Sequence, residues 1–225
     1  MASIVLPNVP STSRQWCRDQ GNRTVGAHAD LLGFGELDAD ALRQTFAEIC
    51  VTDVEADGLS FDPDSVRVVA IRPEDAYGGQ RITLVARLGQ ARLSVQVDVG
   101  IGDDPTPAPT WLDYPSMLGM LRPRLRAYRP ETVIAEKLHA VVTLGSKNSR
   151  TRDFFDIHAL ANHQSFDGDV LASALHATFA RRRTAVPADA IPIGLTPAFA
   201  LLDGKRAQWA AGGPWAPKPS HHPAR

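Results

Sequence analysis

The sequence is poor in cysteine and has no excess of charge of either sign. Its two cysteines, Cys17 and Cys50, are far apart and lack the spacing of metal ligands. We therefore expect both to be reduced thiols and not part of a disulfide framework, which indicates a cytoplasmic protein. Lysine and arginine number 24 against 25 aspartate and glutamate residues. No global basic surface for nucleic acid or an anionic membrane follows from this balance, so any such surface must be local.

Long hydrophobic runs are also missing. No uninterrupted apolar stretch is long enough to span a membrane, and the start, MASIVLPNVPSTSR, lacks a basic segment followed by an apolar one. We therefore expect no membrane partner. Hydrophobic residues nevertheless make up 44% of the chain, which is enough to bury a substantial core.

The spacing of apolar residues changes twice along the chain. It predicts a helix in LDADALRQTFAEIC, capped by Asp38, and then strands in VRVVAI, ITLVARL and LSVQVDV. A short loop through Gly89 predicts that the last two strands form an antiparallel hairpin. The pattern then returns to helical spacing, with helices expected over about 130–144, 150–162 and 169–182 and short ones near 197–210.

A lysine interrupts the apolar face of the first of these C-terminal helices. In TVIAEKLHAVV, Lys137 falls between Val133 and Val141, so its ammonium faces the core side. In SRTRDFFDIHAL, if Ser149 caps the helix, Asp153 and Asp156 also face inward. An isolated buried charge costs several kcal/mol. The residues leave two explanations open, namely a buried ion pair of Lys137 with one of these acids and a lysine that binds phosphate.

Two further carboxylates belong to the predicted sheet. Asp98 lies on the polar face of LSVQVDV, where a solvated strand face is the simpler explanation, although aspartate is depleted within strands. Asp30 precedes an apolar run that could end a strand. Taken together with Lys137 and a helical acid, they would suit metal-dependent phosphoryl or nucleotidyl transfer, which needs oxygen ligands for Mg²⁺ and a cation near the triphosphate.

Several separated blocks carry a family resemblance. The segments DLLGFG, EDAYGGQRITLVARLGQARLSVQVDVGIGD and YRPETVIAEKLHAVVTLGSKNSRTRDFFDIHAL occur in this order. They resemble the nucleotidyltransferase toxin family AbiEii/AbiGii, which includes the MenT-type toxins, from about residue 23 to residue 210. The third segment is similar to that family's Tyr-x-x-Glu-Thr-Val-x-Ala-Glu-Lys block and the acidic block that follows it.

The resemblance implies an α+β fold, with a nucleotidyltransferase-like mixed sheet, flanking helices and a helical C-terminal half. It implies a truncated nucleotidyltransferase core over residues 23–128 and a helical part over 129–211. Composition, rich in Pro with no sustained period, separately predicts a poorly ordered segment over 1–22 and a mobile tail over 212–225. Members add nucleotides, in MenT-type cases to the 3′ end of tRNA, until an antitoxin neutralises them. The implied partners are therefore a nucleoside triphosphate, tRNA and a cognate antitoxin protein.

The resemblance also assigns roles to individual residues. Asp30 and Asp98 match acids that would hold Mg²⁺, and Lys137 matches the lysine that would contact the phosphates of the incoming nucleotide. Arg152, Asp153 and Asp156 match the family's final acidic block. The expected catalytic residues are therefore Lys137, Asp153 and Asp156, and Lys137 and Arg152 are expected to bind the nucleotide.

This chain departs from the family pattern near Asp30. The first acid of the family's Asp-x-Asp is His28 here, and the Gly-Ser or Gly-Gly pair that precedes those acids is replaced by the single residues Gly21 and Gly26. Imidazole is a poor ligand for Mg²⁺. The alternative to an active tRNA nucleotidyltransferase is therefore a truncated, catalytically impaired homologue that binds nucleic acid or antitoxin. A third possibility is a small-molecule nucleotidyltransferase that resembles the antibiotic-modifying enzymes.

Arginines gather in two short segments despite the balanced net charge. The segment LRPRLRAYRP precedes the lysine helix, and ARRRT ends the helix predicted over residues 169–182. Either cluster could contact phosphates, and a solvated helix end, where cations are favoured, is the alternative for Arg181–Arg183. We expect any nucleic-acid binding to weaken steeply with salt.

Overall fold

The structure is a computed structural model in which the chain forms two compact units. It describes residues 27–33, 38–71, 78–102, 105–114 and 121–211. The chain passes from the first unit to the second between Tyr128 and Arg129, and the short segment Pro105–Ala108 also belongs to the second. The expected segments 1–22 and 212–225, and with them Gly21 and Gly26, lie outside the described residues.

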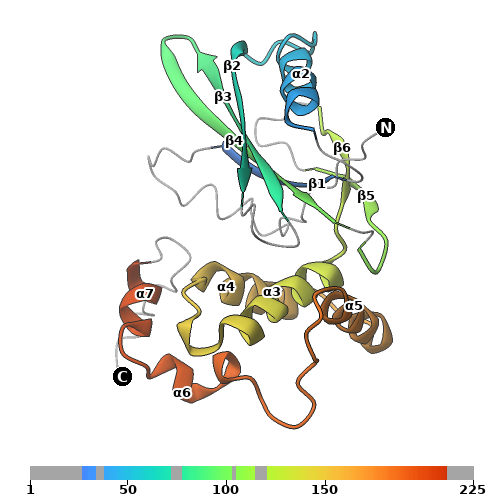
Figure 1. Ribbon diagram of the computed structural model, residues 1–225, viewed down its shortest axis with the longest axis vertical. Coiled ribbons are helices and arrows are strands. Elements are labelled where there is room, and N and C mark those ends of the chain that lie inside the picture. Colours follow the sequence, from blue (N-terminus) through green and yellow to red (C-terminus); the bar gives the residue numbers. More distant parts are fainter. Residues whose placement is uncertain (1–26, 34–37, 72–77, 103–104, 115–120, 212–225) are drawn as a thin grey trace, which may run out of the picture. The chain divides into compact units, whose positions relative to one another are not determined.

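A four-stranded mixed sheet forms the first unit, in the order β1-β4-β3-β2 (Figure 1). Strand β1 runs parallel to β4, whereas β3 is antiparallel to both β2 and β4. The predicted hairpin is confirmed, because β3 and β4 are joined through Gly89, whose positive φ of 55° suits a tight turn. The strands are β1 (Ala27–Gly33), β2 (Leu59–Ile71), β3 (Gly79–Leu88) and β4 (Ala91–Ile101).

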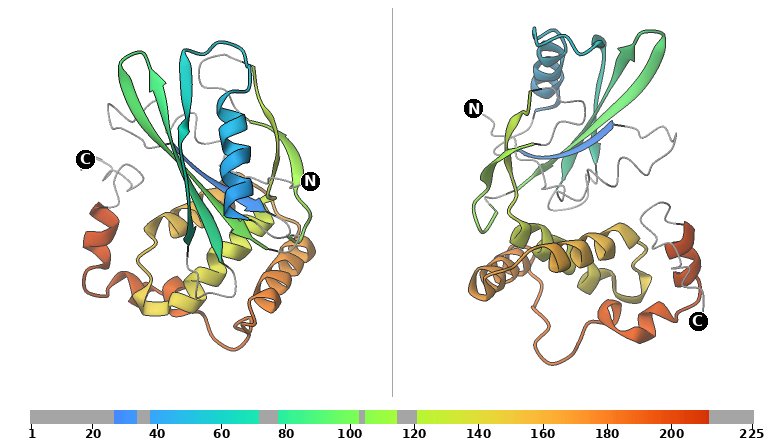
Figure 2. Two further views of the ribbon diagram at one scale, coloured as in Figure 1. Left: turned by 45° about the horizontal axis from the view of Figure 1, so that its top comes forward. Right: turned by 180° about the vertical axis from the view of Figure 1, so that it is seen from behind.

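Helix α2 (Ala39–Cys50) covers one face of this sheet (Figure 2). The Asp38 side chain accepts a hydrogen bond from the Ala41 amide at 2.8 Å, so the predicted cap is confirmed. Phe46 is buried from the helix side against a cluster of strand residues. That cluster consists of Val66, Ile82, Leu84, Val97 and Val99. The hydrophobic effect thus places the even-numbered residues of β4 on the opposite face.

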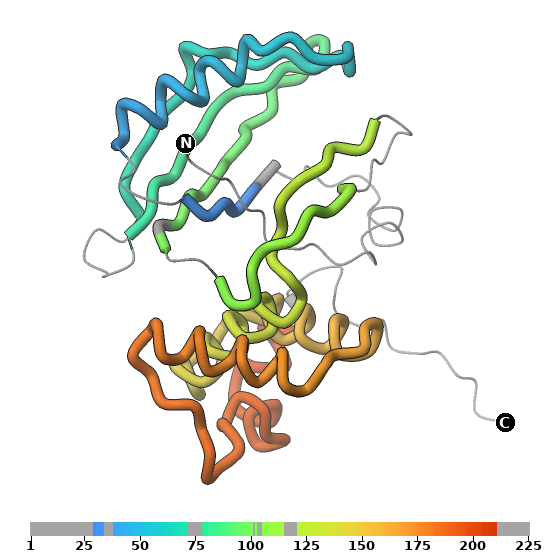
Figure 3. Tube along the Cα trace, turned by 90° about the vertical axis from the view of Figure 1, so that its right-hand side faces the viewer, coloured from blue at the N-terminus to red at the C-terminus, as the bar shows by residue number. Residues whose placement is uncertain are grey.

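A second, two-stranded sheet also belongs to the first unit (Figure 3). It pairs β5 (Thr110–Asp113) with β6 (Arg124–Ala127) in antiparallel register. The Arg124 guanidinium lies 5.4 Å from the centre of the Trp111 ring, a cation–π contact between the two strands. One arginine of the LRPRLRAYRP segment therefore has an aromatic partner within its own unit.

Helices make up the second unit. The long ones are α3 (Pro130–Leu144), α4 (Thr151–His163) and α5 (Gly168–Arg181), followed by the short α6 (Pro197–Ala200) and α7 (Lys205–Ala211). Single turns of 3₁₀ helix, η1 (Gly145–Lys147) and η2 (Ile193–Leu195), lie between them. This order confirms the expected α+β class with a helical C-terminal half. Among the described helices, none is both long and apolar enough to cross a membrane.

Helix α3 packs against both α4 and α5, and its apolar face supplies the core of this unit. Val141, Leu160 and Phe179, one from each helix, are at most 1% exposed. The close approach of η2 to α3 requires a glycine, because a Cβ on Gly194 would lie 2.6 Å from Val141 Cγ1. Tight packing thus fixes α3 between its neighbours.

The expected cap of α4 is wrong. The N-cap is Arg150 rather than Ser149, and its side chain makes no capping bond. The Asn148 side chain instead accepts a hydrogen bond from the Arg150 amide at 2.8 Å, which forms a local turn before the helix. Asparagine competes well for nearby backbone amides, so the turn begins one residue earlier than the sequence pattern indicated.

Candidate active site

Two of the predicted carboxylates lie side by side on the polar face of the sheet. Asp30 of β1 is the register partner of Asp98 of β4 in the parallel ladder. Directly opposed residues of neighbouring strands project from the same face, with the strands about 4.8 Å apart. Because Leu31 and Val97 pack on the core side, Asp30 and Asp98 face away from α2. The fold thus brings together two acids that are 68 positions apart, the difference between 98 and 30.

An arginine from the neighbouring strand holds Asp98. Arg81 of β3 is the antiparallel register partner of Asp98. Its Nε and Nη2 atoms donate to the two carboxylate oxygens at 2.8 Å and 2.7 Å, and Gln96 Nε2 adds a longer bond of 3.3 Å. Hydrogen bonding to Asp98 raises the pKa of Arg81 against the opposing effect of burial, and the charges of Asp98 and Asp30 raise it further. Asp30 and Asp98 therefore share one cationic neighbour.

The lysine of α3 is paired with both acids of α4. Lys137 Nζ lies 3.0 Å from Asp153 Oδ1 and 2.8 Å from Asp156 Oδ2. The side chains of Lys137, Asp153 and Asp156 are 21%, 15% and 21% exposed, so the cluster is half-buried and still reaches solvent. Burial lowers the pKa of Lys137, but the hydrogen bonds and charges of Asp156 and Asp153 outweigh it and leave the pKa raised. The ammonium is therefore protonated near neutral pH.

These five residues fall into two groups, one in each unit. Asp30 and Asp98 belong to the first unit, whereas Lys137, Asp153 and Asp156 belong to the second. The hypothesis from the sequence that they form one metal-dependent transfer site therefore stays a prediction. Arg152, predicted to bind nucleotide, is exposed on α4 next to Asp153.

Behind Lys137, α3 and α5 are joined by a network of neutral and charged groups. Glu136 accepts from Arg181 at 3.0 Å and contacts Arg182 at 3.3 Å. Arg182 donates to His139 Nδ1 at 3.1 Å, so the ring hydrogen lies on Nε2, 3.1 Å from Thr184 Oγ1. Burial and the two arginines lower the pKa of His139 to about 4. Arg181 and Arg182 thus join two helices. Of the three arginines, only Arg183 is exposed, so only Arg183 fits the alternative of a solvated cation at the helix end.

The carboxylates on the sheet fit a divalent metal ion in ligand type. Asp30 and Asp98 offer the oxygen ligands that Mg²⁺ prefers. Within the described residues, no group of three or more histidine, cysteine, aspartate or glutamate side chains is placed to hold a metal. A cation at this position would therefore take two protein carboxylates and would compete with Arg81 for Asp98.

Comparison with known protein families decides the wider class. The family described as "Nucleotidyl transferase AbiEii toxin, Type IV TA system" matches residues 29–212. The chain belongs to this family. The match includes both the Asp30–Asp98 pair and the Lys137 cluster, and it confirms the resemblance expected from the sequence. The family is one of nucleotidyl transferase toxins of type IV toxin-antitoxin systems.

Searches for individual relatives add less. No match is found among curated proteins. Among solved structures, JHP933 from Helicobacter pylori aligns with 15% identity and a TM-score of 0.41, covering 88% of this chain and 79% of that one. A second H. pylori chain, provisionally named a nucleotidyltransferase, aligns with 16% identity and a TM-score of 0.40, covering 88% and 81%. At these scores we draw nothing about the AbiEii chain from either structure.

Sequence reasoning missed Arg81 as a functional-site residue. The only available signal was its position directly before ITLVARL, which is predicted to form a hairpin through Gly89 with LSVQVDV, the segment that holds Asp98. Counting outward from that loop pairs Arg81 with Asp98, and opposite charges directly across a ladder attract each other. The hairpin prediction thus already contained this partner, although the bidentate geometry needed the structure.

Proposed function

We propose that this AbiEii chain is a nucleotidyltransferase toxin that transfers a nucleotide from a nucleoside triphosphate to the 3′ end of tRNA. The register of Asp30 with Asp98 carries the proposal, because it places two carboxylates together on one polar sheet face. Membership of a nucleotidyl transferase family supports the reaction class. The tRNA acceptor comes from the resemblance to MenT-type toxins and is part of the proposal.

Asp30 and Asp98 would hold Mg²⁺ in this reaction. When bound, that ion would neutralise triphosphate oxygens and activate the acceptor hydroxyl. Lys137 would bind the phosphates, since its ammonium is protonated and reaches solvent. Asp153 and Asp156, both from α4, hold the ammonium in place. Arg152, exposed next to this cluster, would add a second positive charge for the nucleotide.

A catalytically impaired homologue that binds nucleic acid or antitoxin is the second candidate. The Arg81 fork favours it, because a bidentate arginine at 2.7 Å and 2.8 Å already neutralises one of the two carboxylates. His28 stands where the family pattern has another acid. In this case the carboxylates of the sheet face would have a structural role only. The basic side chains would bind nucleic acid or antitoxin without catalysing transfer.

Partners and location follow from the same proposal. Membership of a toxin-antitoxin family implies an antitoxin as well as a nucleotide substrate. We propose a cognate antitoxin protein and a cytoplasmic location, which suits a toxin that acts on tRNA.

The test is a transfer assay with the full chain. The purified protein is incubated with Mg²⁺, each labelled nucleoside triphosphate in turn and bulk tRNA, and label on the RNA is measured. We expect labelled tRNA from wild type, loss of label with EDTA, and loss of label in Asp30→Asn. Asp113→Asn, which removes an exposed carboxylate from β5, is the matched control and should retain transfer.

The same assay separates the two candidates. Binding of tRNA without label transfer, at every nucleotide and Mg²⁺ concentration, would select the impaired homologue. Salt adds a check on binding, because contacts to phosphate weaken steeply between low and high salt. A protein that neither labels nor binds tRNA, and that binds no antitoxin, is neither of the two.

A further inference from the structure

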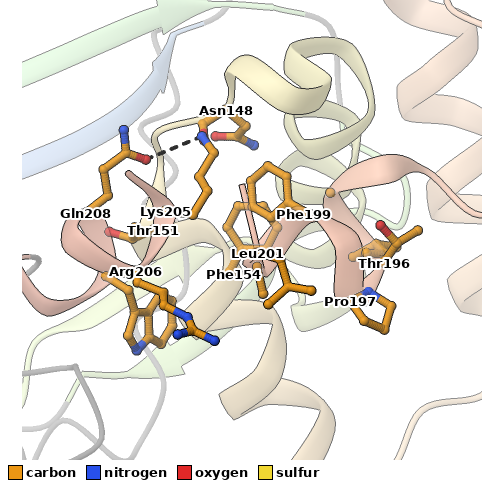
Figure 4. A pocket seen from close by; sticks show the side chains of 14 residues that line it. Asn148, Thr151, Phe154, Thr196, Pro197, Phe199, Leu201, Lys205, Arg206 and Gln208 are labelled. Atoms are coloured by element: carbon orange, nitrogen blue, oxygen red, sulfur yellow. Dashed lines mark hydrogen bonds between the residues drawn. The ribbon is translucent and has the colours of Figure 1, made fainter. Parts of the chain in front are cut away.

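A cavity of about 730 Å³ lies within the helical unit (Figure 4). Its lining comes from the start of α4, from η2 and from α6 and α7, all within the second unit. This volume falls in the range of about 300–1,000 Å³ that is typical of small-ligand sites. The cavity is therefore large enough for a nucleoside monophosphate.

Aromatic side chains form much of its wall. Phe154 of α4 and Phe199 of α6 stack with their ring centres 5.3 Å apart and their planes at 29° (Figure 4). Trp209 of α7 lines the same cavity. Aromatic walls of this kind favour a flat, unsaturated ligand such as a nucleobase.

The charged side chains that line the cavity are all positive. Two cations, Lys205 and Arg206, are among its 14 lining residues, and no aspartate or glutamate is, all of these residues belonging to the described part of the chain. Lys205 Nζ is held by the Asn148 carbonyl at 2.6 Å and Gln208 Oε1 at 3.3 Å, and it lies 4.8 Å from the centre of the Phe199 ring. Arg206 is exposed at the cavity. The excess of positive charge favours an anionic ligand.

A buried amide in this cavity lacks an acceptor. Asn148 is 1% exposed, and its Nδ2 has no hydrogen-bond partner among the described residues. The orientation of the amide is fixed, because Oδ1 accepts from the Arg150 amide at 2.8 Å. A buried donor left without an acceptor is unfavourable, so an accepting ligand atom at this position would stabilise the complex. Nucleobases carry ring nitrogens and carbonyl oxygens that accept hydrogen bonds.

The cavity is separate from the Lys137 cluster. Thr151 and Phe154, which line the cavity, are three residues apart and so share one side of α4. At about 100° per residue, Asp153 and Asp156 project roughly 160° away from that side. A ligand in the cavity therefore lies across α4 from Lys137.

From these observations we propose that the cavity is a second nucleotide-binding site, which takes a base against the aromatic wall and its phosphate at Arg206. The same chemistry is offered by a free nucleoside monophosphate and by an unpaired nucleotide at the end of an RNA strand. This site goes beyond the transfer reaction, and it exists whether or not Lys137 takes part in catalysis.

The test measures binding with no need for turnover. Isothermal titration calorimetry on the full chain uses AMP, CMP, GMP and UMP in turn. Wild type should bind at least one of them, and Arg206→Ala, at an exposed position, should weaken that binding about tenfold through loss of a charged phosphate contact. Arg92→Ala removes one exposed arginine from the sheet unit and should leave binding unchanged.

Further variants locate the site. Trp209→Ala should weaken binding about tenfold and Trp209→Phe should restore most of it, because stacking needs an aromatic ring and not indole itself. A loss of binding in Lys137→Met that Arg206→Ala does not share would place the nucleotide at the transfer site instead. Thermal unfolding of each variant checks that it is folded, and Trp209→Phe keeps the test open if Trp209→Ala is not.

An RNA arm distinguishes the two sources of the nucleotide. A hairpin RNA with an unpaired 3′ overhang is compared with the same hairpin lacking it. Tighter binding of the overhang, with that advantage lost in Arg206→Ala, would support a strand end, and equal binding of both hairpins beside clear monophosphate binding would support a free nucleotide. The proposal is overturned if no nucleotide or RNA binds, if Lys137→Met abolishes binding that Arg206→Ala retains, or if Arg206→Ala binds the monophosphates and both hairpins as wild type does.

Discussion

The sheet face and the helical unit both pair acids with a cation, but they do so in opposite ways. On the sheet, Arg81 donates two hydrogen bonds to the carboxylate of Asp98, and the second acid, Asp30, is exposed beside this pair. In the helices, one lysine is shared by two carboxylates, Asp153 and Asp156. A guanidinium fork is specific to its carboxylate, whereas an ammonium is a compact point charge that can exchange partners. The helical cluster is thus better suited to accept a phosphate.

Substitution of Lys137 should give the largest effect. We expect Lys137→Met to lower nucleotide transfer by at least about 100-fold. The substitution removes the positive charge that would stabilise the negative charge developing on the phosphates in the transition state. The fold should change little, since Asp153 and Asp156 are 15% and 21% exposed and can be hydrated once unpaired. The measurements are the transfer assay and the melting temperature, and Lys147→Met, at an exposed lysine in η1, is the control.

The opposite pattern would assign Lys137 a structural role. Loss of about 3–5 kcal/mol of stability in Lys137→Met, with nucleotide binding intact in the remaining folded protein, is the result expected for a buried ion pair. The helical cluster would then be a structural ion pair, as the Arg81–Asp98 pair would be in an impaired homologue.

The helical unit should also respond to pH through His139. The pKa of His139 is about 4 in the folded chain and 6.5 ordinarily, so the unfolded chain takes up a proton first as pH falls. This contribution to stability is present above pH 6.5 and is lost as pH falls towards 4. We expect wild type to lose about 1–3 kcal/mol more than His139→Gln over this window. Urea unfolding at several pH values measures it, and parallel curves for the two proteins would contradict it.

Release of the arginine fork should change how the sheet face binds metal. Arg81→Gln removes the cation that neutralises Asp98 and is near Asp30, so the two carboxylates should bind Mg²⁺ or Mn²⁺ about tenfold more tightly. Calorimetric titration with each metal checks this, with Arg87→Gln, at an exposed arginine of the same strand, as control. Unchanged or weaker metal binding in Arg81→Gln would mean that the fork organises the carboxylates.

The smallest effect is expected for an ion pair at the surface. Arg43 and Asp40 of α2 lie 3.4 Å apart with side chains 59% and 88% exposed. Arg43→Gln should change the free energy of unfolding by less than about 0.5 kcal/mol, since water and salt screen such pairs. Chemical denaturation measures the change. A larger loss of stability would show that side-chain exposure alone does not distinguish weak ion pairs from strong ones in this protein.

Local signals accounted for much of the fold. The helix capped by Asp38, the hairpin through Gly89 and the three long helices from Pro130 onward were all predicted, because capping, turn conformation and apolar period depend on neighbours in sequence. The cap of α4 was predicted wrongly, since Asn148 competes with Ser149 for the same turn. The pairing of β5 with β6 was not predicted, because both strands are only four residues long.

The candidate site divides along the same line. The helical period alone determined that Lys137, Asp153 and Asp156 face inward, and strand alternation alone determined that Asp98 lies on a polar face. Only the tertiary structure decided that Lys137 contacts both acids, that Asp30 lies in register with Asp98, and that Asn148 Nδ2 is buried without an acceptor. Side-chain direction follows from the periodic backbone of one element, whereas the identity of a partner depends on how separate elements pack, which no short stretch of sequence encodes.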